Sequence, residues 1–304
     1  MFVSVSLLLL GIIGVWIGSG FAINNVSRLA LRARVPSFFM SFLLLGFLTS
    51  FSEIFVGVSA LIDNVPDVFV GNLLGSSVVV FFLVIPLFAL LCNGITLNHT
   101  FSFSHLVLSS IVVLLPALLT LDNVITPLDG LILVVVYAFL LVVQGKDSIR
   151  HLEMLTSGRK VRNMLSLLLK TIGSVAIIFV GANLVIDQVL YLGSVLRIQP
   201  FVLSFILISI GTNIPELSIA IRSLFEKKTT IAFGNYVGSA SFNTLELGLL
   251  SMIHGQKIPA FGSNYAVILF AVGMFLFLIF SRSKKSISRK ESLVLLLVYV
   301  GIIL

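Results

Sequence analysis

Long apolar runs separated by short polar stretches dominate the chain. The runs are unbroken for about 17–25 residues, the length that an α-helix needs to cross a bilayer, whereas strands of a membrane barrel would alternate at every second residue. The first run lacks the charged start and cleavage site of a signal peptide and is expected to be retained. The pattern predicts ten membrane-spanning helices, near residues 3–26, 37–61, 69–93, 103–120, 126–144, 165–186, 199–224, 231–253, 262–281 and 291–304.

Composition agrees with a chain that lies almost wholly in lipid. Hydrophobic residues make up 58% of the 304 residues and charged residues only 10%, against about 25% charged in a soluble domain. Such a chain has too little charge to cover a water-exposed surface. The composition therefore excludes a soluble enzyme, a nucleic-acid-binding protein and a disordered chain. The single cysteine, Cys92, also excludes an intramolecular disulfide.

The positions of the positive charges indicate the orientation in the membrane, because cationic residues gather in cytoplasmic connections. With the N-terminus outside and ten crossings, every Lys and Arg except Arg197 and Lys257 falls on the cytoplasmic side. Both termini are therefore expected outside, and the polar connection 146–163 inside.

The two halves of the chain carry the same polar motif in ungapped register. The matched pairs are Thr49 with Thr212, Glu53 with Glu216, Gly71 with Gly234, Asn72 with Asn235, Gly75 with Gly238 and Ser76 with Ser239. Two leucine-rich sequences match apolar residues by chance, but not these residue types. We infer a duplication, with a first five-helix repeat at 1–145, a cytoplasmic connecting loop at 146–163 and a second repeat at 164–304. Because five is odd, the second repeat crosses in the opposite sense. The predicted fold is an all-α membrane protein with an inverted-topology repeat, an architecture common in secondary transporters.

Three glutamates fall inside the apolar spans: Glu53, Glu216 and Glu246. A charge at the bilayer centre costs about 2.5–3.5 kcal/mol even on insertion scales. The alternative to a functional role is a glutamate near a helix end that reaches the interface or stays protonated. Because Glu53 and Glu216 hold the same position in both repeats, the pattern favours one site that they share near the midplane.

Small oxygen-bearing side chains accompany both carboxylates. Thr49 precedes Glu53, and Thr212 precedes Glu216, by four residues, so each pair shares a helix face. Pro215 lacks an N–H and is expected to break the helix around Thr212, which frees backbone carbonyls to bind cations. The alternative role of these hydroxyls is bonding back to the helix backbone. The four glycines of the motif are expected to let helices approach closely, and its two asparagines either face the site or cap helices.

These oxygens suit a hard cation. The two carboxylates, the hydroxyls, the amide of Asn243 and freed carbonyls supply the roughly six to eight oxygens that Ca²⁺ takes. Two negative charges balance one Ca²⁺ or two Na⁺. No cationic side chain within the spans favours an anionic substrate, and the scattered histidines offer no cluster for a transition metal.

The two Thr-x-x-x-Glu and Gly-Asn-x-x-Gly-Ser segments resemble the alpha repeats of the cation/Ca²⁺ exchanger superfamily, nearest the prokaryotic sodium/calcium exchangers. The resemblance covers both halves and is closest in the second. It implies ten helices with the second and seventh broken, in a prokaryotic inner membrane. It places the ion-binding positions at Thr49, Ser50, Glu53, Ser76, Thr212, Asn213, Glu216, Ser239 and Asn243.

Three positions depart from the family pattern. Ser52 stands where the family usually has proline, so the first helix break is expected to be gentler. Asn213 replaces a serine. Val80 stands where the first repeat usually has asparagine, which Asn243 keeps in the second repeat. The last departure leaves both stoichiometry and ion choice open.

The expected function is secondary antiport of Ca²⁺ against Na⁺ by alternating access at one acidic midplane site, with the first and sixth helices sliding past the rest. The ions and the lipid bilayer are then the partners; no cofactor, enzyme activity, nucleic acid or protein partner is implied. A proton-coupled cation exchanger, with H⁺ as a further ion, is the first alternative, although the His-bearing motif of that branch is absent. A cation channel is the second, and an intramembrane enzyme, for which no catalytic motif is present, is the third.

Glu246 is a hypothetical auxiliary ligand. Ser239, Asn243 and Glu246 follow at i, i+4 and i+7, so they share one helix face that should point at Glu53 and Glu216. Glu246 would compensate for the amide lost at Val80, directly, through water, or by carrying a proton. The alternative is a glutamate towards the end of the eighth helix that stays protonated or reaches the interface and makes no ion contact.

Overall fold

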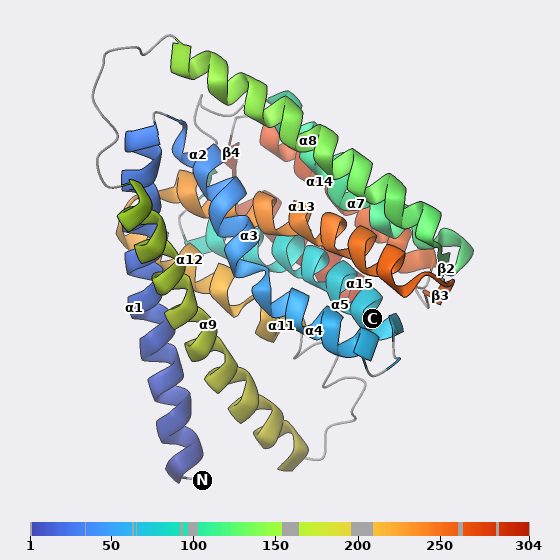
Figure 1. The fold of residues 1–304 in the computed structure, drawn as a ribbon, viewed down its shortest axis with the longest axis horizontal. Coiled ribbons are helices and arrows are strands. Elements are labelled where there is room, and N and C mark those ends of the chain that lie inside the picture. The colour runs from blue at the N-terminus through green and yellow to red at the C-terminus, as the bar shows by residue number, and fades with distance from the viewer. Residues whose placement is uncertain are drawn as a thin grey trace.

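The computed structural model describes residues 2–33, 35–62, 64, 66–91, 94–96, 103–153, 164–195, 209–260, 264–283 and 286–303. Within these ranges the chain is almost entirely helical, as Figure 1 shows. Seven helices of the described chain are long and apolar enough to cross a membrane. The chain is therefore an all-helical membrane protein, and the ten-span count stays a prediction.

The helices of the first half follow the predicted apolar runs. Their bounds, with the short strands and turns between them, are α1 Phe2–Ala33, α2 Ser37–Met40, η1 Ser41–Leu45, α3 Gly46–Thr49, α4 Phe51–Ile62, α5 Pro66–Val79, η2 Val80–Val84, α6 Ile85–Leu91, β1 Ile95–Thr96, α7 Phe103–Leu119, η3 Thr120–Asp122, β2 Val124–Ile125 and α8 Pro127–Glu153. The segments η1 and η2 are π-helical turns inside otherwise continuous helix, a feature often found at functional sites.

The second half repeats this order of long and interrupted helices. Its elements are α9 Met164–Val195, α11 Ser209–Thr212, α12 Ile214–Phe225, α13 Thr229–His254, β3 Ile258–Pro259, α14 Asn264–Ser283, β4 Ser286–Ile287 and α15 Arg289–Ile303. The start of the predicted span 199–224 lies outside the described residues.

The predicted connection after the fifth span begins as helix. The sequence predicts a connecting loop over 146–163, but α8 continues as helix to Glu153. The segment from Lys146 to Glu153 is polar, yet it has no proline or glycine to stop the helix. Hydropathy marks where a helix leaves the lipid, and the helix itself ends only where its backbone is interrupted. The rest of that connection lies outside the described residues.

Helices α1 and α9, which correspond to the first and sixth predicted spans, pack together along one side of the molecule (Figure 1). Glycines mark their crossing: a Cβ added at Gly181 would lie 2.7 Å from the carbonyl oxygen of Gly11, and one at Gly18 would lie 2.9 Å from that of Ser174. Only glycine therefore permits this close approach of α1 to α9.

Helix α13 passes through the middle of the remaining helices, and most of its residues are buried. Two short antiparallel pairings, β1 with β4 and β2 with β3, join loops of the two halves. Glycines again set the packing, because a Cβ at Gly234 would meet the carbonyl oxygen of Phe38 at 2.6 Å, and one at Gly238 would overlap the backbone of Phe42. Gly71 does not fit the predicted packing role, because a Cβ there would meet no atom within 4 Å.

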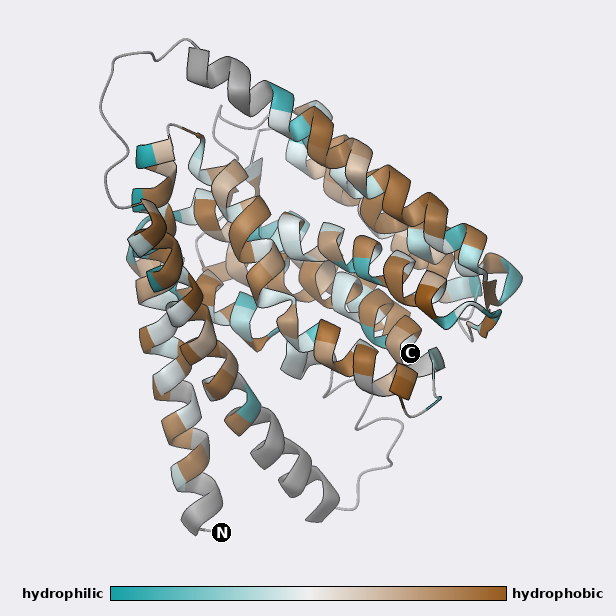
Figure 2. Ribbon diagram, in the orientation of Figure 1, coloured by the Kyte–Doolittle hydropathy of each residue, from teal (hydrophilic) through white to brown (hydrophobic). Residues whose placement is uncertain are grey.

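Large apolar side chains are exposed on the outer helices, and many polar side chains are buried inside together with the apolar core. Figure 2 shows brown, hydrophobic residues along the outer helices. On α8, Val135 and Phe139 are both 58% exposed, and on α14 Phe275 is 65% exposed. Serines, threonines, asparagines and the three membrane glutamates are buried instead. This distribution places the lipid contact outside and a polar centre inside.

Candidate functional site

Two helix interruptions frame the polar centre, one in each half. Helix α3 ends at Thr49 and α4 begins at Phe51, with Ser50 between them at φ −77° and ψ 7°. Helix α11 ends at Thr212 and α12 begins at Ile214, with Asn213 at φ −90° and ψ 7°. The second interruption lies beside Pro215, where the sequence predicts it.

The expectation of a gentler first break is wrong, because Ser50 and Asn213 have nearly the same backbone angles. The first break occurs without proline. Thr49 and Ser50 instead donate their hydroxyls to the carbonyls of Leu45 and Gly46, both at 2.9 Å. Such bonds to the preceding turn compete with the helical ladder and bend helices.

Glu53 lies fully buried at the start of α4, and both carboxylate oxygens accept hydrogen bonds. Ser76 of α5 donates to Oε1 over 3.0 Å, and Ser52 donates to Oε2 over 2.6 Å. The Thr212 hydroxyl lies within hydrogen-bonding reach of the same carboxylate. Hydroxyl groups from both halves of the chain therefore surround Glu53.

Glu216 repeats this arrangement at the start of α12. It is fully buried, and Ser239 of α13 donates to Oε1 over 2.8 Å. The Thr49 hydroxyl lies within hydrogen-bonding reach. The second carboxylate oxygen, Oε2, has no hydrogen-bond partner. One oxygen of this carboxylate is thus free to bind a cation.

The two half-sites touch. The hydroxyl oxygens of Ser50 and Ser239 lie 3.0 Å apart, and Asn213 donates from Nδ2 to Ser76 Oγ over 3.0 Å. These two contacts are equivalent under the sequence repeat, since Ser50 corresponds to Asn213 and Ser239 to Ser76. The structure therefore brings Glu53 and Glu216, with the predicted hydroxyls and amide, into one polar centre.

Asn243 lies one turn further along α13 from Ser239. Its Nδ2 donates to Ser77 Oγ over 3.4 Å, and its Oδ1 has no partner. Val80, which stands at the equivalent position in the first half, is fully buried at the start of η2. The amide that the repeat symmetry would supply there is missing.

Glu246 is buried, with 4% of its surface exposed, and neither carboxylate oxygen has a hydrogen-bond partner. A Cβ added at Gly57 would lie 3.2 Å from its Oε1, so the side chain faces α4. It is also an electrostatic neighbour of Glu53. The carboxylate therefore points between helices rather than to the surface, which argues against a glutamate that reaches the interface.

Three polar contributors lie outside the set of ion-binding residues that the sequence predicts. Ser52 bonds Glu53, Ser77 accepts from Asn243, and the Asn235 Oδ1 atom lies 3.2 Å from the Thr49 hydroxyl. Asn235 belongs to the repeated motif, and that signal pointed to it. Nothing in the pattern distinguishes Ser77 from a serine that merely bonds its own helix, and it also donates to Leu73 O at 3.1 Å.

The ligand types at the centre are carboxylate, hydroxyl and amide oxygens. Among the described residues, no group of three His, Cys, Asp or Glu side chains converges as a metal centre. Hydroxyl and amide oxygens therefore carry much of the coordination that the site can offer. A hydroxyl that donates to the backbone keeps lone pairs for a cation.

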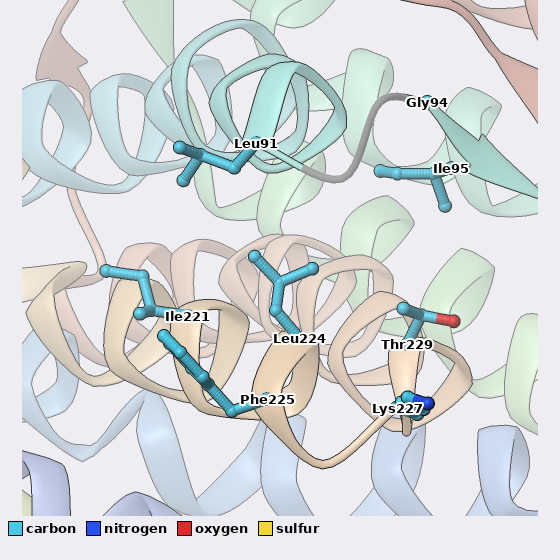
Figure 3. A pocket seen from close by; sticks show the side chains of 8 residues that line it. All are labelled: Leu91, Gly94, Ile95, Ile221, Leu224, Phe225, Lys227 and Thr229. Atoms are coloured by element: carbon cyan, nitrogen blue, oxygen red, sulfur yellow. The ribbon is translucent and has the colours of Figure 1, made fainter.

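A separate cavity of about 710 Å³ lies between the ends of α6 and α12 (Figure 3). In the close view Leu91 and Ile95 face Ile221 and Leu224 across the gap. The lining is mostly aliphatic and holds no carboxylate. This cavity is distinct from the polar centre and does not offer a cation site.

Comparisons with known proteins agree with this geometry. Two curated relatives cover nearly the whole chain: an uncharacterised membrane protein of Methanocaldococcus jannaschii, 25% identical over 96% of this chain and 94% of its own length, and the inner membrane protein YrbG of Escherichia coli, 26% identical over 93% and 90%. The sodium/calcium exchanger MaX1 of Methanosarcina acetivorans is 28% identical over 42% of this chain and 37% of its own.

A solved structure of the sodium-calcium exchanger NCX_Mj, soaked with Na⁺ and Sr²⁺, superposes with a TM-score of 0.85 at 22% identity. The likeness covers 99% of this chain and 98% of that one, so the two share a fold. The family described as sodium/calcium exchanger protein matches residues 3–146 and 166–304. The chain therefore belongs to the sodium/calcium exchanger protein family, whose members are transporters and not enzymes.

Proposed function

We propose that the protein exchanges Na⁺ for Ca²⁺ across the membrane by alternating access at the centre formed by Glu53 and Glu216. The observation that carries the proposal is the burial of both carboxylates in an apolar, membrane-spanning chain, each fixed by a serine of the following helix. Two buried carboxylates are costly in lipid unless a cation compensates them. Because a bound cation would neutralise the buried charges, their burial would favour cation binding.

Charge balance supports the ion assignment. The carboxylates carry two negative charges when ionised, which one Ca²⁺ or two Na⁺ would neutralise. Ligand oxygens would come from Glu53, Glu216 and the surrounding hydroxyls of Thr49, Ser50, Ser76, Thr212 and Ser239, with the amides of Asn213 and Asn243. Competition of the two ions for the same oxygens is what exchange requires, because each must displace the other.

The repeat architecture supports alternating access. We propose two five-helix repeats of inverted topology, 1–145 and 164–304, with both termini outside and α1 and α9 sliding past the other helices. The glycine-lined crossing of α1 and α9 fits such a sliding pair, because it presents few protruding side chains. A prokaryotic inner membrane is the proposed location, in line with the name of the Escherichia coli relative.

A proton-coupled exchanger is the second candidate function. One observation favours it: both carboxylate oxygens of Glu246 lack a partner in a buried position, and a protonated carboxyl is one way to hold such a group. A proton would then take the role of one Na⁺.

Uptake of ⁴⁵Ca²⁺ into proteoliposomes loaded with Na⁺ separates these functions. Sodium-coupled exchange predicts uptake that needs an outward Na⁺ gradient and persists when a protonophore collapses the proton gradient. Uptake driven by a proton gradient in the absence of Na⁺ would support the second candidate and contradict the first. Uptake that follows the Ca²⁺ gradient alone would indicate a channel.

A further inference from the structure

Glu246 is a buried carboxylate that the exchange centre at Glu53 and Glu216 does not use. Neither of its oxygens has a hydrogen-bond partner, and two amides share this property: Asn243, three residues earlier on the same helix α13, at Oδ1, and Asn72 of the neighbouring helix α5 at both Oδ1 and Nδ2. Asn72 is 7% and Asn243 2% exposed. An unpaired buried polar group destabilises the folded protein. Three such groups in one region therefore point to a ligand.

The helix register places these groups on the same side of the exchange centre. Gly57, which faces Glu246, follows Glu53 by one turn of α4. Asn72 precedes Ser76, the partner of Glu53, by one turn of α5. Because only residues 63–65 connect α4 to α5, the two helices run antiparallel, and both steps lead in the same direction. The displacement is one helical turn, about 5.4 Å.

An apolar cluster packs on the far side of Gly57 and Asn72 from Glu53, as the antiparallel arrangement of α4 and α5 predicts. Ala60 of α4, Phe69 of α5 and Leu250 of α13 belong to one buried apolar cluster. The three helices contact one another. These three residues lie farther from Glu53 along their helices than Gly57, Asn72 and Glu246 do. The unpaired polar groups therefore lie between the apolar cluster and the Glu53 carboxylate.

The repeat symmetry supplies no second copy of the group formed by Glu246, Asn72 and Asn243. Under the sequence repeat, Glu246 corresponds to Leu83 and Gly57 to Ala220, so the other half supplies no carboxylate. Asn235, the counterpart of Asn72, has an Oδ1 atom 3.2 Å from the Thr49 hydroxyl. The inverted repeat therefore does not generate a matching group, and the position of Glu246 is a feature of this chain.

We propose that Glu246 forms a second cation site, for Na⁺, one helical turn from the exchange centre, together with the amide oxygen of Asn72 and that of Asn243, which the two sites share. The inference rests on the proposed exchange, because it assigns one of the coupling ions a site of its own. A single carboxylate balances one monovalent charge, whereas Ca²⁺ would leave a net positive charge in lipid and would need about six to eight oxygens. Carboxylate and amide oxygens are hard ligands that suit Na⁺. In the orientation proposed above, this site lies on the outer side of the exchange centre.

Direct binding of ²²Na⁺ to the purified protein in detergent tests this site. Measurements at fixed pH, with Ca²⁺ chelated and N-methyl-D-glucamine as the inert cation, compare the wild type, Glu246→Gln, the double variant Glu53→Gln/Glu216→Gln and the triple variant. We expect Glu246→Gln alone to lower the bound Na⁺ by one ion per protein. We expect the double variant to keep one Na⁺ and the triple variant to lose it.

Two further variants control for folding and for general charge effects. Glu246→Asp keeps the carboxylate and should bind Na⁺ with lower affinity, and Glu291→Gln removes a carboxylate at the start of α15 and should change nothing. Equal Na⁺ binding by the double and triple variants, or no Na⁺ binding by the double variant, would overturn the second site. Failure of the exchange proposal would appear separately, as ⁴⁵Ca²⁺ uptake that survives in the double variant.

Discussion

The hydroxyl of Ser76 lies 3.0 Å from the carboxylate of Glu53, and the helix of Ser76 directly follows that of Glu53. Ser239 repeats this contact with Glu216 at 2.8 Å. Each buried carboxylate is thus held by a donor from the same repeat. A donor of this kind orients the carboxylate, and in the proposed site its own oxygen would add a further ligand atom.

Replacing either serine should weaken cation binding without abolishing it. A hydrogen bond to a charged group contributes about 1.5–3 kcal/mol, so Ser76→Ala and Ser239→Ala should each lower Ca²⁺ affinity about tenfold or more. Equilibrium ⁴⁵Ca²⁺ binding to purified protein measures this effect. Ser281→Ala, whose hydroxyl bonds its own helix at Phe277 O, serves as the control. Unchanged affinity in both site variants would remove the serines from the ligand set.

Close helix approach at Gly238 should make this position intolerant of a side chain. A Cβ there would overlap the backbone of Phe42, whereas one at Gly71 would meet nothing within 4 Å. Overpacking costs about 1–3 kcal/mol, so Gly238→Ala should lower the melting temperature in detergent. Gly71→Ala is the matched control and should leave stability equal or slightly higher, because alanine favours helix. Equal melting temperatures for the two variants would contradict the packing.

A polar cluster ties α1 to the connection between α12 and α13. Asn24 donates from Nδ2 to Glu226 Oε1 over 3.2 Å and accepts from Lys228 Nζ over 2.6 Å. Arg222 pairs with Glu226 at 3.0 Å and lies over the ring of Trp16. If α1 slides during transport, this cluster must open.

Loosening the cluster should therefore change the transport rate rather than the affinity. Partly exposed ion pairs contribute about 0.2–1 kcal/mol, so Glu226→Gln should raise the rate of Na⁺-driven ⁴⁵Ca²⁺ uptake by about twofold at saturating Ca²⁺. Equilibrium Ca²⁺ binding, measured in parallel, should stay the same. A change in affinity with no change in rate would argue against an opening step at Asn24.

Sidedness follows from the positive charges and can be measured by cysteine labelling. On a Cys92→Ser background, Leu155→Cys should react only with a reagent applied from the cytoplasmic side, because the connection 146–163 is proposed to lie inside. Lys257→Cys, in the connection between α13 and α14, should react only from the outside. Reversed labelling of the two positions would overturn the proposed orientation.

The sequence alone predicts the helical fold and the pairing of Glu53 with Glu216, because a polar motif repeated in register among apolar residues has few explanations besides duplication. It also predicts the break beside Pro215. It does not predict an equally sharp break at Ser50, since that break depends on hydroxyls bonding the preceding turn, which any helical serine can do.

Other details depend on tertiary contacts that a single sequence does not contain. Gly71 and Gly234 are equivalent under the sequence repeat, yet of these two only Gly234 meets another backbone. Ser77 becomes a partner of Asn243 only through the crossing of α5 and α13. The helical conformation of residues 146–153 in α8 shows the same limit, because hydropathy marks the membrane boundary and not the extent of the helix.

The most direct test of the account measures Na⁺-driven ⁴⁵Ca²⁺ uptake by Glu53→Gln and Glu216→Gln, with Glu291→Gln as the control. Glutamine keeps the size of the side chain and removes the charge that the cation needs. The account predicts near-complete loss of exchange in both site variants, with insertion and melting temperature preserved, and normal exchange in the control. Near-normal exchange by either folded site variant would contradict the claim that both carboxylates hold the transported ion.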